Sequence, residues 1–333
     1  MDECRVEPVG QGIGMVRVPV PLPVKATNVY VLGDPPDVIV DCGTLHPTGL
    51  AVLMAAVRRP PRAIMVTHLH VDHCGAAGAL QREWGCEVWM SEDDAEEGRR
   101  FYTGPSENDR VYWEMFLRYG MPEDGARATY AAVDRIRGLT DYPVVDRLLR
   151  DGDTIEAGGR QYVVLLTPGH TMGHLCLLEK DSGVLFAGDH ILPRITPNVG
   201  LSTREGFNPI REYVASLRRV AALSPSVAYP GHGPVVDDPA GRARETVRHH
   251  VARARRMLDI LSRKASSAYE VAVEVFGKDL DPFQQRFAVG ETVAHLDWIV
   301  SEGWASRSDE DGVTIYSAAR PGEIFEIPTG DEP

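Results

Sequence analysis

A short segment near residue 70 carries four side chains of the kinds that bind metal ions. Residues 67 to 73 read Thr-His-Leu-His-Val-Asp-His and directly follow the apolar run from Ala63 to Val66. Imidazole nitrogens and carboxylate oxygens are suitable ligands for zinc, iron and manganese. The His-x-His pair is compatible with one metal ion on a loop that leaves a strand. The Asp-His pair that follows can turn towards a second ion close by.

Three further candidate ligands lie downstream, each at the end of a β-like run. His170 stands in Thr-Pro-Gly-His, Asp189 in Gly-Asp-His and His232 in Pro-Gly-His-Gly. A single histidine at a strand end is usually a surface or core residue, but the complete set is typical of a two-metal hydrolytic centre. The candidate metal ligands are therefore His68, His70, Asp72, His73, His170, Asp189 and His232.

Length, composition and charge limit the class of protein. The chain has 333 residues, 43% hydrophobic and 25% charged, which is ordinary for a soluble globular protein with one large and one smaller domain. It has no apolar run near the roughly 18 residues of a membrane helix and no signal-peptide pattern. Five scattered cysteines argue against a disulfide framework, so we expect a cytoplasmic protein with no membrane partner. The net charge of −13 disfavours nucleic acid as a partner.

The elements that must position these side chains form a mixed α/β pattern. Several short strands are expected between residues 13 and 66, followed by a helix at 76–84 and a strand at 87–90. Residues 92–147 carry an acidic start and helically spaced aromatic side chains, which indicates a helical insertion. Further strands are predicted at 162–166, 175–178, 184–187 and 227–229, with a helix from about 209 to 223.

The C-terminal part has a different, mostly helical pattern. A long helix is predicted at 240–264, shorter helices near 268–276 and 283–302, and a hairpin at 304–317. Helix, helix, helix, hairpin is the order of a winged-helix module. We therefore predict a catalytic domain over residues 1–237, a winged-helix-like domain over 238–319 and a loose tail over 320–333.

The metal-ligand motifs resemble those of the metallo-β-lactamase fold superfamily. The resemblance covers residues 13 to about 237 and implies a four-layer αββα sandwich with the metal ions at one edge between two sheets. It implies His68, His70 and His170 as ligands of metal 1, Asp72, His73 and His232 as ligands of metal 2, and Asp189 as a bridge. Asp41 matches a position that orients the ligand cluster in this superfamily. The C-terminal layout resembles the lactamase-β-like-2 subgroup.

The expected activity is that of a dinuclear metal-dependent hydrolase. Two divalent ions, expected to be zinc although iron and manganese also suit the ligands, lower the pKa of a bridging water. The resulting hydroxide attacks a carbonyl carbon, while Asp72 acts as the catalytic group that orients it and moves a proton. The resemblance to the glyoxalase II-like group favours a small thioester, acyl ester or lactone substrate, with coenzyme A-linked acyl groups included, and a homodimer is a candidate assembly.

Three alternatives remain open at the level of sequence. The first alternative is a single-strand endoribonuclease, which the resemblance to the lactamase-β-like-2 subgroup implies. The His-x-His-x-Asp-His motif also occurs in mononuclear iron dioxygenases of the persulfide type, which use only part of this ligand set. A DNA-binding regulator is disfavoured because the candidate recognition helix contains Glu291, Asp297 and Glu302. The predicted helix 240–264 is basic, which leaves the binding of coenzyme A or RNA phosphates open.

Overall fold

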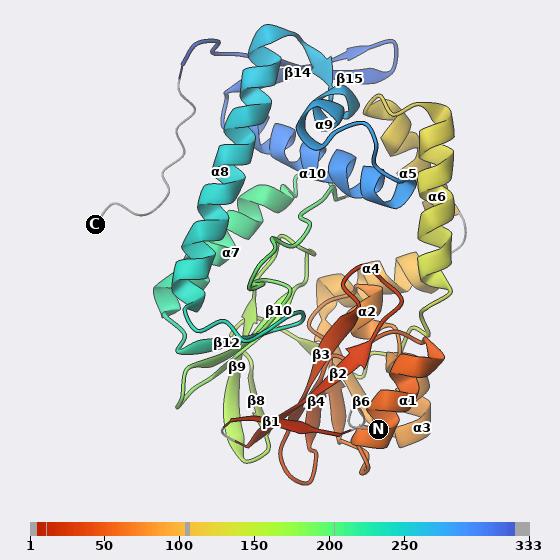
Figure 1. Cartoon of the computed structure of the whole chain (residues 1–333), viewed down its shortest axis with the longest axis vertical. Coiled ribbons are helices and arrows are strands. Elements are labelled where there is room, and N and C mark those ends of the chain that lie inside the picture. The colour runs from red at the N-terminus through yellow and green to blue at the C-terminus, as the bar shows by residue number, and fades with distance from the viewer. Residues whose placement is uncertain (1–4, 11, 104–106, 203, 324–333) are drawn as a thin grey trace. The chain divides into compact units, whose positions relative to one another are not determined.

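A computed structural model describes residues 5–10, 12–103, 107–202 and 204–323 (Figure 1). The chain divides into two compact units. The first unit contains residues 1–104, 136–197 and 220–242, and the second contains 105–135, 198–219 and 243–333. Each unit is therefore discontinuous in sequence. The predicted domain boundaries after residues 237 and 319 stay predictions, and most of the loose tail predicted over 320–333 lies outside the described residues.

Two β-sheets form the first unit. The seven-stranded sheet has its strands in chain order, antiparallel from β1 to β4 and parallel from β4 to β7. Its strands are β1 (Glu7–Gly10), β2 (Ile13–Pro19), β3 (Ala26–Leu32), β4 (Val38–Val40), β5 (Ala63–Met65), β6 (Glu87–Ser91) and β7 (Arg147–Leu149). The five-stranded sheet has the order β12-β11-β10-β9-β8. Its strands are β8 (Thr154–Ala157), β9 (Arg160–Leu166), β10 (Leu175–Glu179), β11 (Val184–Gly188) and β12 (Val227–Pro230).

The two sheets pack against each other through alternate residues of their strands. Tyr30 of β3 and Met65 of β5 belong to the same buried cluster as Tyr162 of β9 and Phe186 of β11. The rings of Tyr30 and Phe186 meet edge to face, with 5.3 Å between their centroids. Because side chains alternate across a strand, the neighbours of these residues point to the outer faces of the sheets. This core holds the ends of both sheets in a fixed relation.

Helices cover the outer face of the seven-stranded sheet. Val31 and Ile64 pack in a second buried cluster with Leu53 of α1 (Pro47–Ala56) and Leu80 of α3 (Ala77–Trp84). The short helix α2 (Val71–Cys74) follows β5 and carries part of the metal-ligand motif. The mixed α/β sandwich implied by the resemblance is confirmed.

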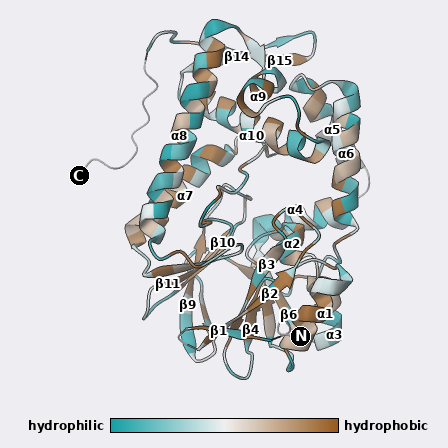
Figure 2. Cartoon of the chain, viewed as in Figure 1, coloured by the Kyte–Doolittle hydropathy of each residue, from teal (hydrophilic) through white to brown (hydrophobic). Residues whose placement is uncertain are grey.

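The helices after residue 91 account for the insertion and most of the second unit. They are α4 (Glu92–Thr103), α5 (Glu107–Arg118), α6 (Glu123–Arg137), α7 (Pro209–Leu223), α8 (Pro239–Arg263), α9 (Ala268–Phe276) and α10 (Pro282–Ser301). Figure 2 shows hydrophilic and hydrophobic residues around α8, as expected for a helix with one buried face. Among the described helices, none has the length and apolar character needed to cross a bilayer.

The order helix, helix, helix, hairpin predicted for the C-terminal part is present. Capping boxes start α9 at Ser267 and α10 at Asp281, so both helix starts are set locally by the sequence. The hairpin of β14 (Ala305–Glu310) and β15 (Val313–Ala318) turns at Asp311 and Gly312, and the two-residue strand β13 (Ser266–Ser267) pairs with β15. The description of this module as a winged helix stays a prediction.

A buried polar cluster joins α8 to α10 within the second unit. The imidazole of His250 lies 3.1 Å from that of His295, measured from Nδ1 to Nε2, and His295 Nδ1 donates to the carbonyl of Glu291 at 2.7 Å. Arg253 forms an ion pair with the Glu291 carboxylate. Burial lowers the pKa of His295 to about 3, and burial together with His295 lowers the pKa of His250 well below its usual range. Both imidazoles are therefore neutral at physiological pH.

The histidine pair predicts that acid destabilises the second unit. An unfolded histidine takes up a proton below its ordinary pKa of 6.5, whereas folded His295 does so only near 3. Its contribution to the free energy of unfolding is present above pH 6.5 and falls by about 1.4 kcal/mol per pH unit below it. Hydrogen exchange in α10, corrected for intrinsic rates, should show weaker protection at about pH 5.5 than at about pH 7.5.

A His295→Gln variant provides the comparison. Burial also raises the pKa of Glu291, which acts in the opposite sense, so the difference between parent and variant isolates the share of His295. The variant should lose less α10 protection between the two pH values. Identical pH dependence in the two proteins would contradict the prediction.

Candidate metal centre

The seven candidate ligands all lie in the first unit, in segments that follow four strands, and Asp72 and His73 belong to the short helix α2. The segment from His68 to His73 follows β5, His170 lies between β9 and β10, Asp189 follows β11, and His232 follows β12. The face-to-face packing of the two sheets brings these strand ends together. The structure therefore unites side chains that are 164 positions apart in sequence, counted from residue 68 to residue 232.

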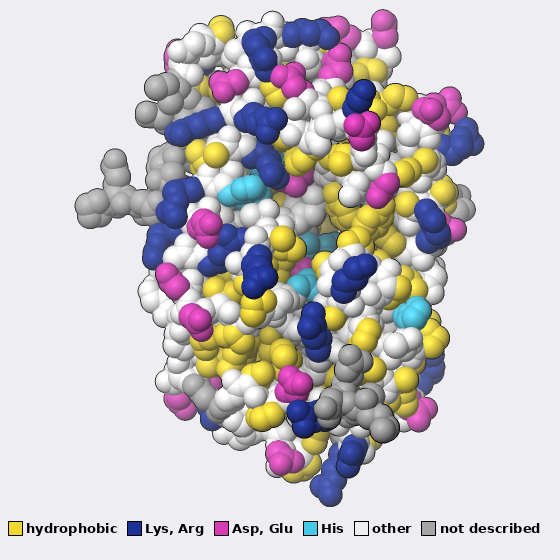
Figure 3. Space-filling model, in the orientation of Figure 1, with side chains coloured by type: hydrophobic (Ala, Val, Ile, Leu, Met, Phe, Trp, Pro, Cys, Tyr) yellow, Lys and Arg dark blue, Asp and Glu magenta, His cyan; other side chains and the backbone are white. Residues whose placement is uncertain are grey.

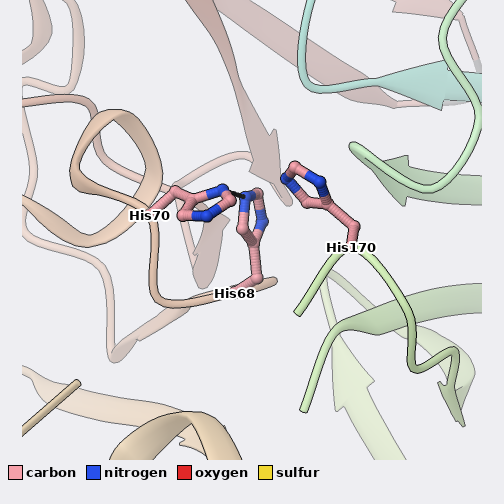
Figure 4. A group of neighbouring side chains, drawn as sticks. All are labelled: His68, His70 and His170. Atoms are coloured by element: carbon pink, nitrogen blue, oxygen red, sulfur yellow. Dashed lines mark hydrogen bonds between the residues drawn. The ribbon is translucent and has the colours of Figure 1, made fainter. Parts of the chain in front are cut away.

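Three histidines form the first group, which we call trio 1 (Figure 4). His68 Nε2 lies 3.1 Å from His70 Nδ1. The ring of His170 stands with its centroid 4.8 Å from that of His68 and 4.4 Å from that of His70. His68 is completely buried, whereas His70 and His170 are partly exposed. Trio 1 thus brings three imidazoles together around one point.

Asp72, His73 and His232 form the second group, trio 2. His232 Nε2 lies 3.2 Å from Asp72 Oδ2 and 3.3 Å from His73 Nε2. The distance between His73 Nε2 and Asp72 Oδ2 is 3.9 Å. All three residues are buried. This is a compact group of two imidazoles and one carboxylate.

The carboxylate of Asp189 lies between the two trios. Its Oδ2 is 3.7 Å from His170 Nε2 of trio 1 and 3.5 Å from His232 Nε2 of trio 2. Its Oδ1 is 3.5 Å from His73 Nε2. One carboxylate therefore faces both groups, which is the geometry that a bridging ligand requires.

Asp41 makes hydrogen bonds that reach two of the candidate ligands. Its Oδ2 accepts a hydrogen bond from His73 Nδ1 at 2.7 Å, and its Oδ1 accepts from the amide of Thr67 at 2.8 Å. The hydroxyl of Thr67 also donates to Asp41, so its oxygen accepts from His68 Nδ1 at 3.0 Å. Asp41 thus fixes one nitrogen of His73 directly and one nitrogen of His68 through Thr67.

These hydrogen bonds show that the residues suit a cation. His73 Nδ1 donates to Asp41, and His232 Nδ1 donates to the carbonyl of Ala26 at 2.8 Å. In the neutral rings, both Nε2 atoms therefore carry lone pairs, and these atoms face each other across 3.3 Å. Two facing lone pairs repel unless a positive charge lies between them. The set of donor atoms therefore fits a bound metal ion.

The pKa shifts support the same conclusion for trio 2. Burial alone would lower the pKa of His232, but Asp189 and Asp72 raise it to about 10. Burial likewise opposes protonation of His73, but Asp41, Asp189 and Asp72 raise its pKa well above the usual range. In trio 1 the pKa of His70 is lowered to about 3, first by burial and then by His170. Trio 2 thus attracts positive charge, and the His70 imidazole is neutral.

Gly231 has no side chain, and this leaves room for the side chains of Asp189 and His73. A Cβ atom on Gly231 would lie 2.5 Å from Asp189 Oδ1 and 2.6 Å from His73 Cε1. The residue before His232 therefore has to lack a side chain for the loops after β11 and β12 to approach. The first glycine in the Pro-Gly-His-Gly motif has this physical explanation.

Several neighbouring residues support the cluster. His174 Nδ1 pairs with the Thr167 hydroxyl at 2.8 Å, and its Nε2 accepts from the amide of Asp189 at 3.1 Å, so His174 connects the loop after β9 to a candidate ligand. His190, the residue after Asp189, is buried as well. The Cys74 thiol is buried beside the cluster and donates to the carbonyl of Leu69.

Two groups of residues in the structure were not predicted from the sequence. Asp94 of α4 makes hydrogen bonds to the loops of trio 1, although its sequence context, one of five acidic residues between 92 and 97, gives no signal. His250, Glu291 and His295 also lie close enough together to hold an ion. The charge of Glu291 is already neutralised by Arg253, and His250 is paired with His295. The burial of this group is therefore explained without a metal ion.

Two protein families match the chain, and one of them contains the whole candidate site. The family described as "Metallo-beta-lactamase superfamily" matches residues 22–232. A second family, "Metallo-beta-lactamase-like, C-terminal domain", matches residues 254–319. The first match contains every candidate metal ligand. The second covers most of the C-terminal module.

Individual proteins give the same result. The chain is 27% identical over 322 residues to "Probable metallo-hydrolase YqjP" of Bacillus subtilis, covering 90% of this chain and 96% of that protein. It is 25% identical over 248 residues to "Beta-lactamase-like protein 2 homolog" of Caenorhabditis elegans, covering 73% and 68% of the two chains. The solved structure of a metallo-beta-lactamase family protein from Thermus thermophilus has 32% identity and a TM-score of 0.81, covering 92% and 98%. A beta-lactamase domain protein from Burkholderia ambifaria has 27% identity and a TM-score of 0.83, covering 95% of each chain.

The contact of Gly231 predicts the effect of one added methyl group. In a Gly231→Ala variant the new Cβ overlaps both Asp189 and His73, so both side chains should be displaced from their positions beside residue 231. We expect the affinity of the folded chain for divalent metal to fall about 10- to 100-fold, as is typical when the support of ligands is disturbed. Competition with a chelating dye, together with elemental analysis, measures this affinity.

Gly125→Ala is a matched control. Gly125 lies in α6 without a positive φ, and a Cβ there would meet ordinary contacts from 3.4 Å outwards. This variant should bind metal like the parent. Equal metal affinity of the Gly231→Ala variant and the parent would show that the close packing at residue 231 is unimportant for the centre.

Proposed function

The chain belongs to the metallo-beta-lactamase superfamily, and on this basis we propose that it is a dinuclear hydrolase of thioesters or related acyl esters and lactones. Its resemblance to named metallo-hydrolases supports the class of reaction. The observation that carries the proposal is the position of Asp189, whose carboxylate faces trio 1 and trio 2 at once. A mononuclear site has no need for this arrangement.

The two trios supply the proposed metal ligands. Trio 1, His68, His70 and His170, would hold metal 1, and trio 2, Asp72, His73 and His232, would hold metal 2. Asp189 would bridge the two. Imidazole and carboxylate together suit zinc, iron and manganese, and we propose zinc as the ion to test first.

The residues around the proposed ions divide the work of hydrolysis. When bound, two divalent ions make water acidic near neutral pH and polarise a substrate carbonyl. Burial would raise the pKa of Asp72, but His73 and His232 lower it to about 2. Its carboxylate is therefore ionised at neutral pH and would serve metal 2 as an anionic ligand. We also propose that Asp72 orients the reacting water and moves a proton towards the leaving group.

The charges on the chain favour a small acyl substrate over a polyanion. The net charge is −13, and basic and acidic side chains are interspersed on the face drawn in Figure 3. Acidic residues from neighbouring helices also neutralise part of the basic helix predicted over 240–264. Arg253 pairs with Glu291, Arg263 with Glu274, and Lys264 with Glu270. These pairs weaken the case for this helix as a phosphate-binding surface, so we propose simple acyl thioesters ahead of coenzyme A-linked ones.

Removing single ligands tests the proposal. Asp189→Ala and His70→Ala variants should lose thioester hydrolysis by at least about 100-fold, because each removes a group that positions the reacting water. Elemental analysis of the purified parent should give two metal ions per chain and fewer in each variant. A His46→Ala variant changes a partly exposed histidine outside the cluster and should keep both metal and activity. Full turnover by a folded Asp189→Ala variant would refute the proposal.

A substrate panel decides between the proposed function and its alternatives. Acyl thioesters with and without coenzyme A, lactones, single-stranded RNA and a persulfide with oxygen are offered to the metal-replete parent. We expect thioester or lactone cleavage that disappears in the Asp189→Ala variant. RNA cleavage that is lost in that variant would replace the proposal with a nuclease. One iron per chain with oxygen uptake would replace it with a dioxygenase.

A further inference from the structure

Asp94 of α4 links the two loops that carry trio 1. Its Oδ2 accepts a hydrogen bond from the amide of Leu69 at 2.9 Å and from the hydroxyl of Thr171 at 2.7 Å. Its Oδ1 accepts from the amide of Gly173 at 2.7 Å. Leu69 lies between two ligands of trio 1, and Thr171 directly follows the third. One carboxylate is therefore bonded to both segments that must meet at the first ion.

The first of these segments is held on both sides of Leu69. The amide of Leu69 belongs to the peptide group that follows His68, and its carbonyl belongs to the peptide group that precedes His70. Asp94 accepts from that amide, while the hydroxyl of Tyr102, also on α4, donates to that carbonyl at 3.0 Å. Helix α4 thus sets the orientation of the backbone between the two imidazoles.

The second segment is equally constrained. The loop that carries His170 is closed by a hydrogen bond from the amide of Thr167 to the carbonyl of His174 at 2.8 Å. Asp94 binds this loop at two points, the side chain of Thr171 and the backbone of Gly173. A Cβ on Gly173 would lie 2.8 Å from Asp94 Oδ1 and would overlap the hydroxyl of Ser91, so only glycine permits this approach.

The burial of Asp94 shows that these bonds matter. The residue has 0% of its surface exposed. Moving a carboxylate out of water costs several kcal/mol unless good hydrogen bonds replace its hydration. The donors to this carboxylate within the described residues all belong to the two ligand-bearing loops. Asp94 is therefore compensated only when the loops hold the positions that trio 1 requires.

We propose that Asp94 is a positioning residue that sets the geometry and affinity of the first metal site. The inference rests on the proposed function, since it requires that trio 1 binds metal. Asp41 orients His73 on the trio 2 side, and Asp94 holds the trio 1 loops. Asp41 also reaches His68 of trio 1 through Thr67, so the centre depends on two buried carboxylates from different elements, the residue after β4 and the first turn of α4.

Cobalt binding tests the role of Asp94 without any substrate. The metal-free parent is titrated with Co²⁺ against a competing chelator, and the visible absorption bands report the ligand geometry. We expect Asp94→Ala to weaken one of the two bound equivalents about 10- to 100-fold and to change its absorption bands. Glu96→Gln removes an exposed carboxylate from the same helix and should leave affinity and bands as in the parent.

A second pair of variants covers the case in which Asp94→Ala does not fold. Thr171→Val removes one hydrogen bond to Asp94 and keeps the shape of the side chain, whereas Thr171→Ser keeps the hydroxyl. The valine variant should show weaker Co²⁺ binding and shifted bands, and the serine variant should restore both. Equal affinity and identical bands in the folded Asp94→Ala variant, or in both Thr171 variants, would overturn the inference.

The parent titration separates this inference from the proposed function. A parent chain that binds a single Co²⁺ ion would refute the dinuclear proposal, and the inference would fall with it if the Asp94→Ala variant bound that ion equally well. A parent that binds no Co²⁺ would refute both. A parent that binds two ions, with variants that bind them equally well, would refute the role of Asp94 and leave the proposed function standing.

Discussion

The hydrogen bond between Asp41 and His73 is the contact on which the centre depends. Asp41 directly follows β4 and has a positive φ of 65°, a conformation that costs a residue with a side chain about 1 kcal/mol or more. Its amide is fixed by the carbonyl of Met65 at 2.8 Å. In this position its carboxylate reaches both Thr67 and His73, so β4, the loop after β5 and α2 are tied at one point. The backbone strain is offset by these hydrogen bonds.

The sandwich core makes this local arrangement useful. Parallel strands β4 and β5 end at the same edge of one sheet, and parallel strands β11 and β12 end together in the other. Large side chains between the sheets, such as Tyr30 and Phe186, fix one edge against the other. Asp189 and His232 therefore meet the histidines of the first sheet. A cluster of this kind needs a rigid frame, because it concentrates carboxylates and lone pairs that repel one another without a cation.

Electrostatics gives the two trios different characters. In trio 2 the carboxylates of Asp41, Asp72 and Asp189 outweigh the cost of burial and raise the pKa of the histidines. In trio 1 burial dominates, and the pKa values of His68 and His70 are lowered. The chain thus places neutral imidazoles beside an anionic group. Such a pair of environments would suit the two proposed ions, with Asp189 facing both groups.

Sequence alone identified the side chains that gather at the centre and several of the elements around it. The candidate ligands could be identified because four of them form one short motif, His-x-His-x-Asp-His. The other three could be identified because each lies beside a glycine at the end of an apolar run. The helices at 209–223 and 268–276 were predicted with the bounds they have, since periodicity and capping act locally.

The role of Asp94 was not predictable, because its partners Leu69 and Gly173 lie 25 and 79 positions away. The pairing of Arg253 with Glu291 was hidden for the same reason, and it turned an apparently basic helix into a partly neutral one. Secondary structure depends largely on neighbouring residues, whereas burial and long-range hydrogen bonds exist only once the chain has folded.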